Sequence, residues 1–394
     1  MKKIAFLMAS PFTKGGEQRI VTVVSNSLQE AGYDVTILCT DPDPVNYDLY
    51  HLNKKVHIKY VEAYYKDPNV INSRIKRDKM NAENANTGKY KHFFWIQKYF
   101  ICDRLVSKVL SDAINEEDFD YVISVSTMFN TMLAVIADKI RAKTIGWQHS
   151  MYDVYFETPG IRHYNQDKFS KYMFKKLDRY VVLSRYDQEK LKEKFHADSV
   201  VIHNMNPIDV KSPSQLDKKH FLALGRFVKV KNFELLIDMF YEFHKRNKEW
   251  ILDIYGEGPL KEALEKKIQE YHLSKFVLLH SYEEDISKCY LNSSIHLVTS
   301  QYEGWSLVTT EAMEYGLPTI SFDIPCIAER IEDGKNGYLI KRYDQEDFVE
   351  KMLLLANDPE KIKEMGKNAR EYCHSNPNSQ ILNQWIQLFN ELEK

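Results

Sequence analysis

The chain has 394 residues, too many for one compact core and enough for two domains of ordinary size. Its apolar fraction of 44% excludes a mainly disordered chain, and its formal net charge of −2 gives no reason to expect a nucleic-acid partner. The five cysteines are odd in number and scattered, which argues against a disulfide framework or a zinc site and indicates a reducing compartment.

The first ten residues, MKKIAFLMAS, contain an apolar run only from Ile4 to Ala9. A secretory signal core is usually longer, so this run predicts a β-strand. No stretch of the chain reaches the roughly 18 apolar residues that a membrane span needs. We expect a cytoplasmic protein, with peripheral contact to the inner face of the plasma membrane left open.

Short apolar strands alternate with helical patterns in the first half, which predicts a parallel sheet covered by helices on both faces. The expected elements, in chain order, are strand 4–9, helix 18–31 and strands 34–39, 56–61, 121–126, 144–147, 180–183 and 200–202. Residues 66–100 interrupt this pattern with basic clusters followed by KYKHFFWIQKYF. They fit a helical insertion with a buried aromatic face, or a basic and aromatic element that contacts an acceptor or a membrane.

Residues 205–219 are polar, contain two prolines and show no periodicity, so they predict a linker after a first domain at 1–204. The alternation then restarts within 220–376. The expected elements are strands 221–224, 250–255, 276–279, 295–298 and 319–322, with helices 233–245, 260–271 and 307–315. The sequence therefore predicts a second doubly wound α/β domain, and ligands of such folds bind at the carboxyl ends of the strands.

The stretch EGWSLVTTE at 303–311 follows one of these strands and opens a helix. Gly304 allows a ligand to approach the backbone closely, and the first N–H groups of a helix can hold a phosphate. Glu311 is placed to accept both hydroxyls of a ribose. The alternative is a capped surface helix with two solvated glutamates.

A second stretch, GRFVKVKN at 225–232, directly follows a strand. Arg226 offers a planar fork and Lys231 a point charge, and together they suit a diphosphate that gains charge as it leaves. Asn232 is a candidate N-cap for the next helix. The alternative is a loop with incidental basic residues.

Together, these two stretches resemble glycosyltransferase family 4, whose members retain the anomeric configuration of the donor and have the two-domain GT-B fold. The resemblance covers nearly the whole chain. It includes KGGEQR at 14–19, VVLSRYDQEKL at 181–191, VIHNMNPID at 201–209, IYGEGPL at 254–260 and EAMEYGLPTISFD at 311–323. It implies two Rossmann-like domains facing a cleft, and a final helix within 377–394 that crosses back onto the first domain.

The resemblance also implies roles for matching residues. Arg226 and Lys231 would bind the donor diphosphate, Glu311 the ribose, and Glu303 the donor sugar. Several neighbours would complete the donor site, namely Gly15, Gly16, Gly256, Gly258, Gly304, Trp305, Ser306 and Leu307, and the stretch 280–286 would border the base. His149 ends a strand, where similar family members place a histidine at the sugar; a lone histidine is otherwise usually structural.

Two Asp-x-Asp patterns, at 41–43 and 118–120, could suggest a metal-dependent transferase. One lies in an Asp-Pro turn and the other precedes a strand, so we interpret both as structural. We expect no metal and no cofactor, because Arg226 and Lys231 would supply the positive charge. The resemblance then implies front-side attack, in which the departing phosphate oxygen takes the proton of the incoming hydroxyl.

The sequence thus predicts transfer of a hexose or N-acetylhexosamine from a nucleotide sugar, by family frequency a UDP-sugar. The expected acceptor is a glycan, lipid-linked or wall-polymer molecule in the synthesis of a bacterial surface polysaccharide. Two alternatives share the architecture: a nucleotide-sugar 2-epimerase and a non-catalytic subunit that binds a glycan or a partner. A nicotinamide-dependent dehydrogenase fits poorly, because no Gly-x-Gly-x-x-Gly turn follows the first strand.

Overall fold

The structure is a computed structural model that describes residues 1–161, 163–281, 283 and 285–394. These residues divide into two compact units. The first unit combines Met1–Pro207 with Asn378–Lys394, and the second is Ile208–Pro377. The division after Pro207 falls inside the polar stretch 205–219 expected as a linker. From Ile208 onward this stretch packs into the second unit, where the Ser214 backbone N–H donates to the Tyr315 carbonyl at 2.9 Å.

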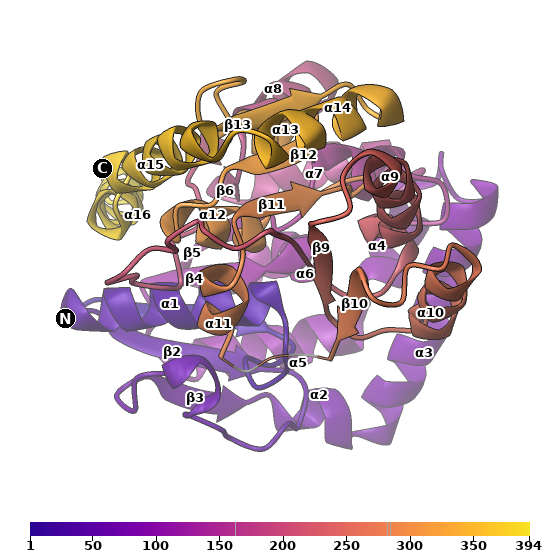
Figure 1. Cartoon of the computed structure of the whole chain (residues 1–394). Helices are drawn as coiled ribbons and strands as arrows, with labels where there is room; N and C mark the ends of the chain where they lie inside the picture. The colour runs from indigo at the N-terminus through magenta and orange to yellow at the C-terminus, as the bar shows by residue number, and fades with distance from the viewer. Residues whose placement is uncertain (162, 282, 284) are drawn as a thin grey trace. The chain divides into compact units, whose positions relative to one another are not determined.

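The first unit is built on a seven-stranded parallel sheet in the order β3-β2-β1-β4-β5-β6-β7 (Figure 1). Its elements are β1 (Lys3–Met8), α1 (Gly16–Glu30), β2 (Asp34–Cys39), η1 (Leu49–His51), β3 (His57–Tyr60), α2 (Glu62–Lys66), α3 (Pro68–Thr87), α4 (Phe94–Ile101), α5 (Arg104–Asn115), β4 (Tyr121–Val125), α6 (Ser126–Ile136), η2 (Ala137–Lys139), β5 (Lys143–Trp147), η3 (Asp153–Glu157), α7 (Asp167–Lys176), β6 (Arg179–Val182), α8 (Arg185–Phe195), β7 (Val200–Val201) and α16 (Asn378–Leu392).

Local sequence signals explain where several helices of the first unit begin. Asp67 caps α3 by accepting from the Asn69 N–H at 2.8 Å, and Pro68 follows at the first helical position. Asp103 caps α5 in the same way, through the Val106 N–H at 2.9 Å. Every residue of β4 is buried, which is why the inner strands of this parallel sheet are continuous apolar runs in the sequence.

The second unit has a six-stranded parallel sheet in the order β10-β9-β8-β11-β12-β13. Its elements are β8 (His220–Leu224), η4 (Lys229–Lys231), α9 (Phe233–Arg246), β9 (Ile251–Tyr255), α10 (Lys261–Glu270), β10 (Val277–His280), α11 (Ser287–Leu291), β11 (Ile295–Val298), α12 (Leu307–Glu314), β12 (Thr319–Phe322), α13 (Pro325–Ala328), β13 (Gly337–Ile340), α14 (Gln345–Ala356) and α15 (Pro359–Ser375). This is the Rossmann strand order, and the chain reverses direction across the sheet between β8 and β11.

These sheets confirm the prediction of two Rossmann-like α/β units. The expected strands match the observed ones to within one or two residues at each end. β13 was not predicted; its four residues follow a loop and carry little periodic signal. The insertion at 66–100 is helical, as one of its two interpretations required, and forms α3 and most of α4.

Helix α16 returns to the first unit and completes its core. The Trp385 ring meets the Trp147 ring at a centroid distance of 5.1 Å, and Phe389 stacks on Tyr121 at 4.6 Å. The Tyr121 hydroxyl also donates to the Phe389 carbonyl at 3.2 Å.

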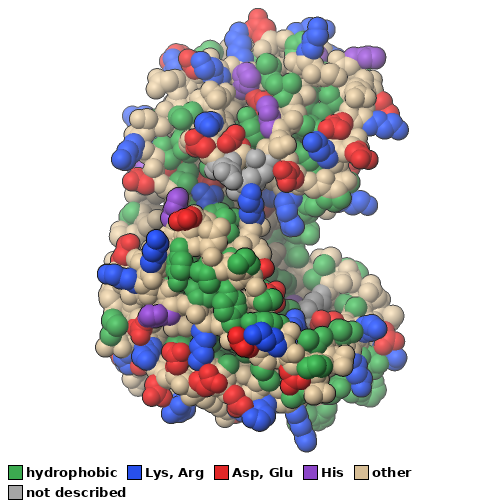
Figure 2. All heavy atoms as spheres, turned by 90° about the horizontal axis from the view of Figure 1, so that it is seen from below, with side chains coloured by type: hydrophobic (Ala, Val, Ile, Leu, Met, Phe, Trp, Pro, Cys, Tyr) green, Lys and Arg blue, Asp and Glu red, His purple; other side chains and the backbone are tan. Residues whose placement is uncertain are grey.

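Side chains of both charge signs are interspersed over the face drawn in Figure 2, in keeping with the small net charge. Among the described residues, no helix is long and apolar enough to cross a membrane.

Candidate functional site

The candidate site in the second unit lies where the chain reverses direction across the sheet, at the carboxyl ends of β8 and β11. The loops after β8 and β9 are joined there by main-chain hydrogen bonds: the Phe227 N–H donates to the Glu257 carbonyl at 2.7 Å, and the Leu260 N–H to the Phe227 carbonyl at 3.1 Å. A Cβ atom at Gly256 would lie 1.9 Å from the Gly225 carbonyl oxygen. Glycine is therefore required for the two loops to meet.

Lys231 and Glu303 form the charged centre of this site. The Lys231 Nζ lies 2.6 Å from Glu303 Oε1, and the Ser300 hydroxyl donates to the same oxygen at 2.7 Å. Both side chains are largely buried. The Lys231 stem passes over Gly225, whose missing side chain leaves room for it. The structure thus brings together two predicted site residues that are 72 positions apart in the sequence.

The backbone around this ion pair is fixed by further hydrogen bonds between the loops after β8 and β11. The Gln301 N–H donates to the Val230 carbonyl at 2.8 Å, and the Thr299 hydroxyl to the Lys231 carbonyl at 3.0 Å. Arg226 comes from the same loop as Lys231, but its side chain is exposed and forms no ion pair among the described residues. The site therefore presents one cation held by a carboxylate and one in contact with solvent.

The loop from Gly304 to Ser306 leads from this ion pair into α12. Ser306 adopts a left-handed conformation with φ of 52°, and its hydroxyl lies 2.8 Å from that of Thr309. Such a conformation is uncommon outside glycine and asparagine and occurs often at functional sites. Leu307 is the first helical residue, so the N-terminal N–H groups of α12 begin directly after the loop.

Arg330 anchors this loop and was not among the predicted site residues. Its guanidinium is buried 4.4 Å from the centre of the Trp305 ring and donates to the Ser306 carbonyl at 3.2 Å. It also donates to the Cys326 carbonyl at 3.2 Å and to the Thr310 hydroxyl at 2.6 Å. In the sequence Arg330 lies between Glu329 and Ile331, and nothing there indicated that it is buried or which groups it contacts.

Glu311 lies on the buried side of α12 and has no solvent-accessible surface. Its Oε2 accepts a hydrogen bond of 2.7 Å from the Tyr290 hydroxyl. Contact between this carboxylate and a ribose would therefore require a local opening of the structure. The stretch 280–286, expected beside the base, contains Tyr282 and Glu284, which lie outside the described residues.

The remaining predicted site residues belong to the first unit. Gly15 immediately precedes α1, and its N–H donates to the Tyr50 hydroxyl at 2.9 Å; Gly16 is the first residue of the helix. In the following position, burial raises the pKa of the Glu17 carboxyl to about 7. Glu17 was not predicted, because its sequence neighbours give no indication that its carboxyl is partly shielded from solvent.

His149 follows β5, as predicted, and its ring lies 4.3 Å from the Trp147 ring centre. Its Nε2 is buried and has no hydrogen-bond partner among the described residues. Burial lowers the pKa of this histidine to about 3, so its imidazole is neutral at physiological pH. A neutral ring can accept or donate a hydrogen bond at Nε2, depending on its tautomer.

The side chains of the Asp-x-Asp pattern at 118–120 have partners in the first unit. Asp120 Oδ2 accepts from the Lys3 N–H at 2.8 Å, and Asp118 pairs with Arg141 at 3.1 Å. Within the described part of the chain, no three His, Cys, Asp or Glu side chains are arranged to hold a metal ion. The Arg226–Lys231 region has the cations that would fit a diphosphate.

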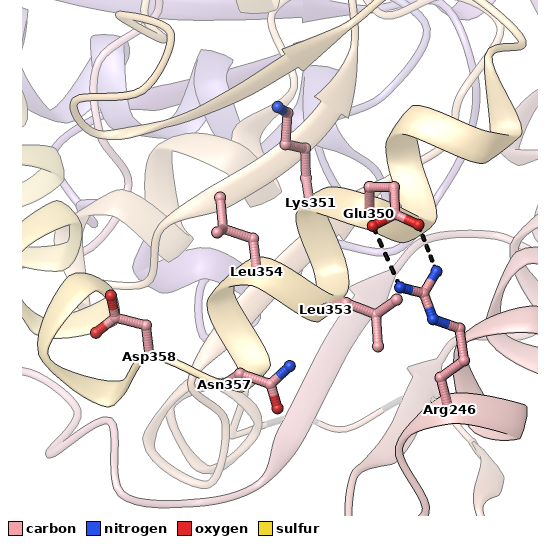
Figure 3. A pocket seen from close by; sticks show the side chains of 7 residues that line it. All are labelled: Arg246, Glu350, Lys351, Leu353, Leu354, Asn357 and Asp358. Atoms are coloured by element: carbon pink, nitrogen blue, oxygen red, sulfur yellow. Dashed lines mark hydrogen bonds and ion pairs between the residues drawn. The ribbon is translucent and has the colours of Figure 1, made fainter.

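A separate surface pocket of about 500 Å³ lies between α9 and α14 and contains none of the predicted site residues. Figure 3 shows the Arg246 guanidinium facing the Glu350 carboxylate, with which it forms an ion pair across the pocket wall. The pocket is widely open to solvent. It therefore gives no second candidate for the functional site.

The fold and the charged loops define the class of a GT-B glycosyltransferase, and the comparisons with known proteins agree. The model "Glycosyltransferase Family 4" matches residues 14–210, and the model "Glycosyl transferases group 1" matches residues 204–372. Since the first match covers half of the chain, the chain belongs to glycosyltransferase family 4. This confirms the resemblance seen in the sequence.

Curated relatives include an uncharacterized glycosyltransferase of Haemophilus influenzae, 26% identical over 98% of this chain and 99% of its own length. The amylovoran biosynthesis glycosyltransferase AmsD of Erwinia amylovora is 26% identical over 99% and 100%. A poly(ribitol-phosphate) alpha-N-acetylglucosaminyltransferase of Staphylococcus aureus is 35% identical over 44% of this chain and 36% of that protein.

Solved structures share the fold at low sequence identity. A mutant of S. aureus TarM in complex with fondaparinux, alpha-GlcNAc-glycerol and UDP has a TM-score of 0.76 at 20% identity, over 99% of this chain and 100% of that one. The pneumococcal O-GlcNAc transferase GtfA in complex with UDP and GlcNAc has a TM-score of 0.73 at 18% identity, over 99% of both chains. The chain is therefore a glycosyltransferase with the GT-B fold.

Proposed function

We propose that this chain transfers a hexose or N-acetylhexosamine from a UDP-sugar to a glycan, lipid-linked or wall-polymer acceptor of a bacterial surface polysaccharide. The observation that carries the proposal is the buried Lys231–Glu303 pair beside Arg226, at the position where Rossmann-like sheets bind nucleotides. Relatives named for amylovoran and poly(ribitol-phosphate) synthesis support the acceptor class. Fold neighbours in complex with UDP support the nucleotide.

Lys231 and Arg226 would bind the diphosphate of the donor and stabilise its charge as it leaves. Glu303 keeps Lys231 oriented through the 2.6 Å contact, and it would contact the donor sugar. No metal or cofactor is part of the proposal, because the two cations and the N–H groups at the start of α12 supply the electrophilic contacts.

The proposed reaction retains the anomeric configuration. The acceptor hydroxyl oxygen forms a bond to the anomeric carbon on the face from which UDP leaves, and the bond between that carbon and the phosphate oxygen breaks. The departing phosphate oxygen takes the hydroxyl proton, so the products are the glycoside and UDP. The buried, unpartnered His149 Nε2 is available for a hydrogen bond to a sugar hydroxyl.

We place the reaction in the cytoplasm, because all five cysteines are free thiols, as expected in a reducing compartment. A peripheral position at the inner face of the plasma membrane would bring the chain to a lipid-linked or growing polymer. A binding subunit without activity or a 2-epimerase remains distinguishable by experiment, since the first releases no UDP and the second consumes donor without an acceptor.

The test is nucleoside diphosphate release from a panel of nucleotide sugars, with chelator present and with bacterial membrane extract or wall polymer as acceptor. Lys231→Ala should lower turnover about 10²–10³-fold, because one charge-stabilising contact is lost. Lys229→Ala is the matched control, since Lys229 is an exposed lysine two residues away in the same loop. Glu303→Ala should also abolish most activity.

Three results would contradict the proposal. A requirement for Mg²⁺ or Mn²⁺ would exclude the metal-independent site. An inverted anomeric centre in the product, read by NMR, would exclude the retaining mechanism. Equal activity of the Lys231→Ala and Lys229→Ala variants would exclude Lys231 from the site.

A further inference from the structure

Large exposed hydrophobic side chains cluster on one part of the first unit. Of the nine such residues among the described ones, four lie between positions 75 and 99, namely Ile75, Phe93, Trp95 and Tyr99. Trp95 is 76% exposed, Phe93 57% and Tyr99 40%. Exposed tryptophan and phenylalanine in one cluster indicate a contact surface, because isolated surface apolar residues are normally scattered.

Helix α4 has two aromatic sides. Phe94 and Phe100 point inward: the Phe94 ring stacks on Phe169 of α7 at 6.2 Å, and Phe100 is fully buried. Trp95 and Tyr99 are one helical turn apart and share the exposed side. The buried aromatic face expected for this insertion is formed by Phe94 and Phe100, while Trp95 and Tyr99 are left exposed on the other side of α4.

Lysines surround the exposed rings. The Lys98 Nζ lies 5.8 Å from the Trp95 ring centre, and the Lys76 Nζ lies 5.8 Å from the Tyr99 ring centre. Lys79 lies one turn from Lys76 on α3 and is exposed. Within the described part of the chain, none of these three lysines forms an ion pair. We define Phe93, Trp95, Tyr99, Lys76, Lys79 and Lys98 as the aromatic–lysine face.

The charge around this face differs from that of the molecule. Residues 68–101 contain seven Lys or Arg and two Asp or Glu, and α7, which packs against α4, contains four lysines and one aspartate. The whole chain has 54 basic and 56 acidic residues. Of the acidic groups nearby, Glu83 is paired with Lys89 at 2.8 Å and Asp138 with Lys176 at 2.6 Å. Arg77 of this segment is buried beside Asp103 and adds nothing to the face. The positive charge at the surface therefore comes from the lysines, of which Lys76 and Lys79 are exposed and form no ion pair among the described residues.

We propose that the aromatic–lysine face docks the chain on an anionic lipid bilayer. Aromatic side chains favour the headgroup region, and lysines can extend to lipid phosphates while their stems lie along apolar surface. Each lysine near an anionic bilayer strengthens binding about fivefold. Protein interfaces are also rich in aromatic rings but are depleted in lysine, whereas an anionic bilayer complements both features.

The structure provides an internal probe for the test. Four of the five tryptophans, Trp147, Trp250, Trp305 and Trp385, are buried, so Trp95 is the one that reports on solvent. When the full chain is mixed with vesicles of phosphatidylglycerol and phosphatidylcholine, tryptophan emission should shift to shorter wavelength and the protein should sediment with the vesicles. Trp95→Phe should keep sedimentation and lose the shift. Pure phosphatidylcholine vesicles and high salt should give neither signal.

Substitutions separate this face from general adsorption. Lys76→Gln with Lys79→Gln should weaken partitioning about 20- to 30-fold, and Phe93→Ala with Trp95→Ala about tenfold or more. The matched control is Lys363→Gln with Lys367→Gln, two exposed lysines of α15, which should change nothing. Folding is checked by the thermal transition of each variant, and activity on a soluble acceptor should be unchanged.

The proposal is overturned if anionic vesicles do not sediment the chain, or if they do so without an emission shift and independently of Phe93 and Trp95. It is also overturned if the chain binds a soluble polyphosphate but not the vesicles, and if Lys76→Gln with Lys79→Gln abolishes the polyphosphate binding. The face would then recognise an anionic polymer. None of these results depends on the identity of the sugar donor.

Discussion

Glu17 is a half-buried acid directly after Gly15 and Gly16, at the start of α1, where a helix N-terminus would by itself favour the charged form. Burial outweighs that effect and raises the pKa of its carboxyl from 4.5 to about 7. Because the folded state binds this proton more tightly than the unfolded state, the free energy of unfolding falls as pH rises from about 4.5 to 7.

We therefore expect Glu17→Gln to remove this pH dependence. The variant should gain stability relative to the original chain as pH rises through that window, by at most about 1.4 kcal/mol per pH unit. Urea unfolding of both proteins at several pH values gives the difference. A difference that stays constant between pH 4.5 and 7 would contradict the assignment.

His149 and His296 act in the opposite direction, since burial lowers the pKa of each imidazole from 6.5 to about 3. The unfolded chain takes up these protons first, so both residues lower stability as pH falls below about 6.5. The comparison with Glu17→Gln cancels this contribution, because both histidines are present in both proteins.

At the scale of elements, the contact between the loops after β8 and β9 depends on Gly256. We expect Gly256→Ala to push these loops apart, because the new methyl group would lie 1.9 Å from the Gly225 oxygen. Gly334→Ala is the matched control: both glycines have positive φ, but nothing lies within 4 Å of a Cβ at Gly334. The control should cost about 1 kcal/mol, from backbone strain alone.

This prediction is tested by measuring the thermal unfolding and the UDP affinity of both variants. Gly256→Ala should lower the midpoint of the second unit and weaken UDP binding, whereas Gly334→Ala should affect the midpoint only. Equal effects of the two variants would mean that the loops tolerate a wider separation.

Arg330 is the second element-scale test, because it ties the loop before α12 to the segment around α13. We expect Arg330→Met to raise the KM for the donor, since Ser306 and Cys326 lose the donor of their carbonyl hydrogen bonds. Arg330→Lys keeps the charge without the planar fork and should recover only part of the loss. Arg370→Met, which removes one hydrogen bond to the Val210 carbonyl, is the control for general destabilisation.

The prediction fails if Arg330→Met leaves the KM for the donor unchanged while its thermal stability equals that of Arg370→Met. The loop would then hold its conformation without the guanidinium. Recovery of the original KM in Arg330→Lys would show that charge alone is sufficient.

Most of the strands could be predicted because inner strands of parallel sheets are short apolar runs bounded by turn residues, as Tyr121–Val125 and Ile295–Val298 illustrate. The two charged loops could be found because each follows such a strand. The ion pair between Lys231 and Glu303 was not predicted, since it depends on β8 and β11 being neighbours in the sheet. Arg330 and Glu17 could not be found, because burial of a charged side chain is decided by distant segments.

At the scale of the whole molecule, the first unit is made from two separate parts of the chain. Helix α16 buries Ile381, Trp385, Leu388, Phe389 and Leu392. At roughly 1.5–3 kcal/mol for each buried side chain, their contribution is comparable to the total stability of a typical domain.

We expect a chain ending at Pro377 to lose the folded first unit and to keep the second. Calorimetry should show a single remaining transition, and that transition should still rise in temperature when UDP is added, because Lys231 and Glu303 lie in the second unit. Removal of only Glu393 and Lys394 is the control and should leave two folded units. Loss of both transitions in the longer truncation would show that the units do not fold independently.

The return of α16 also sets an order of events during synthesis. A ribosome releases Met1–Pro207 long before residues 378–392, so the first unit emerges with Trp147 and Tyr121 lacking their partners. The second unit is contiguous and can fold as soon as it leaves the ribosome. The part of the protein made first is therefore completed last, and during that interval its exposed core is the segment most in need of a chaperone.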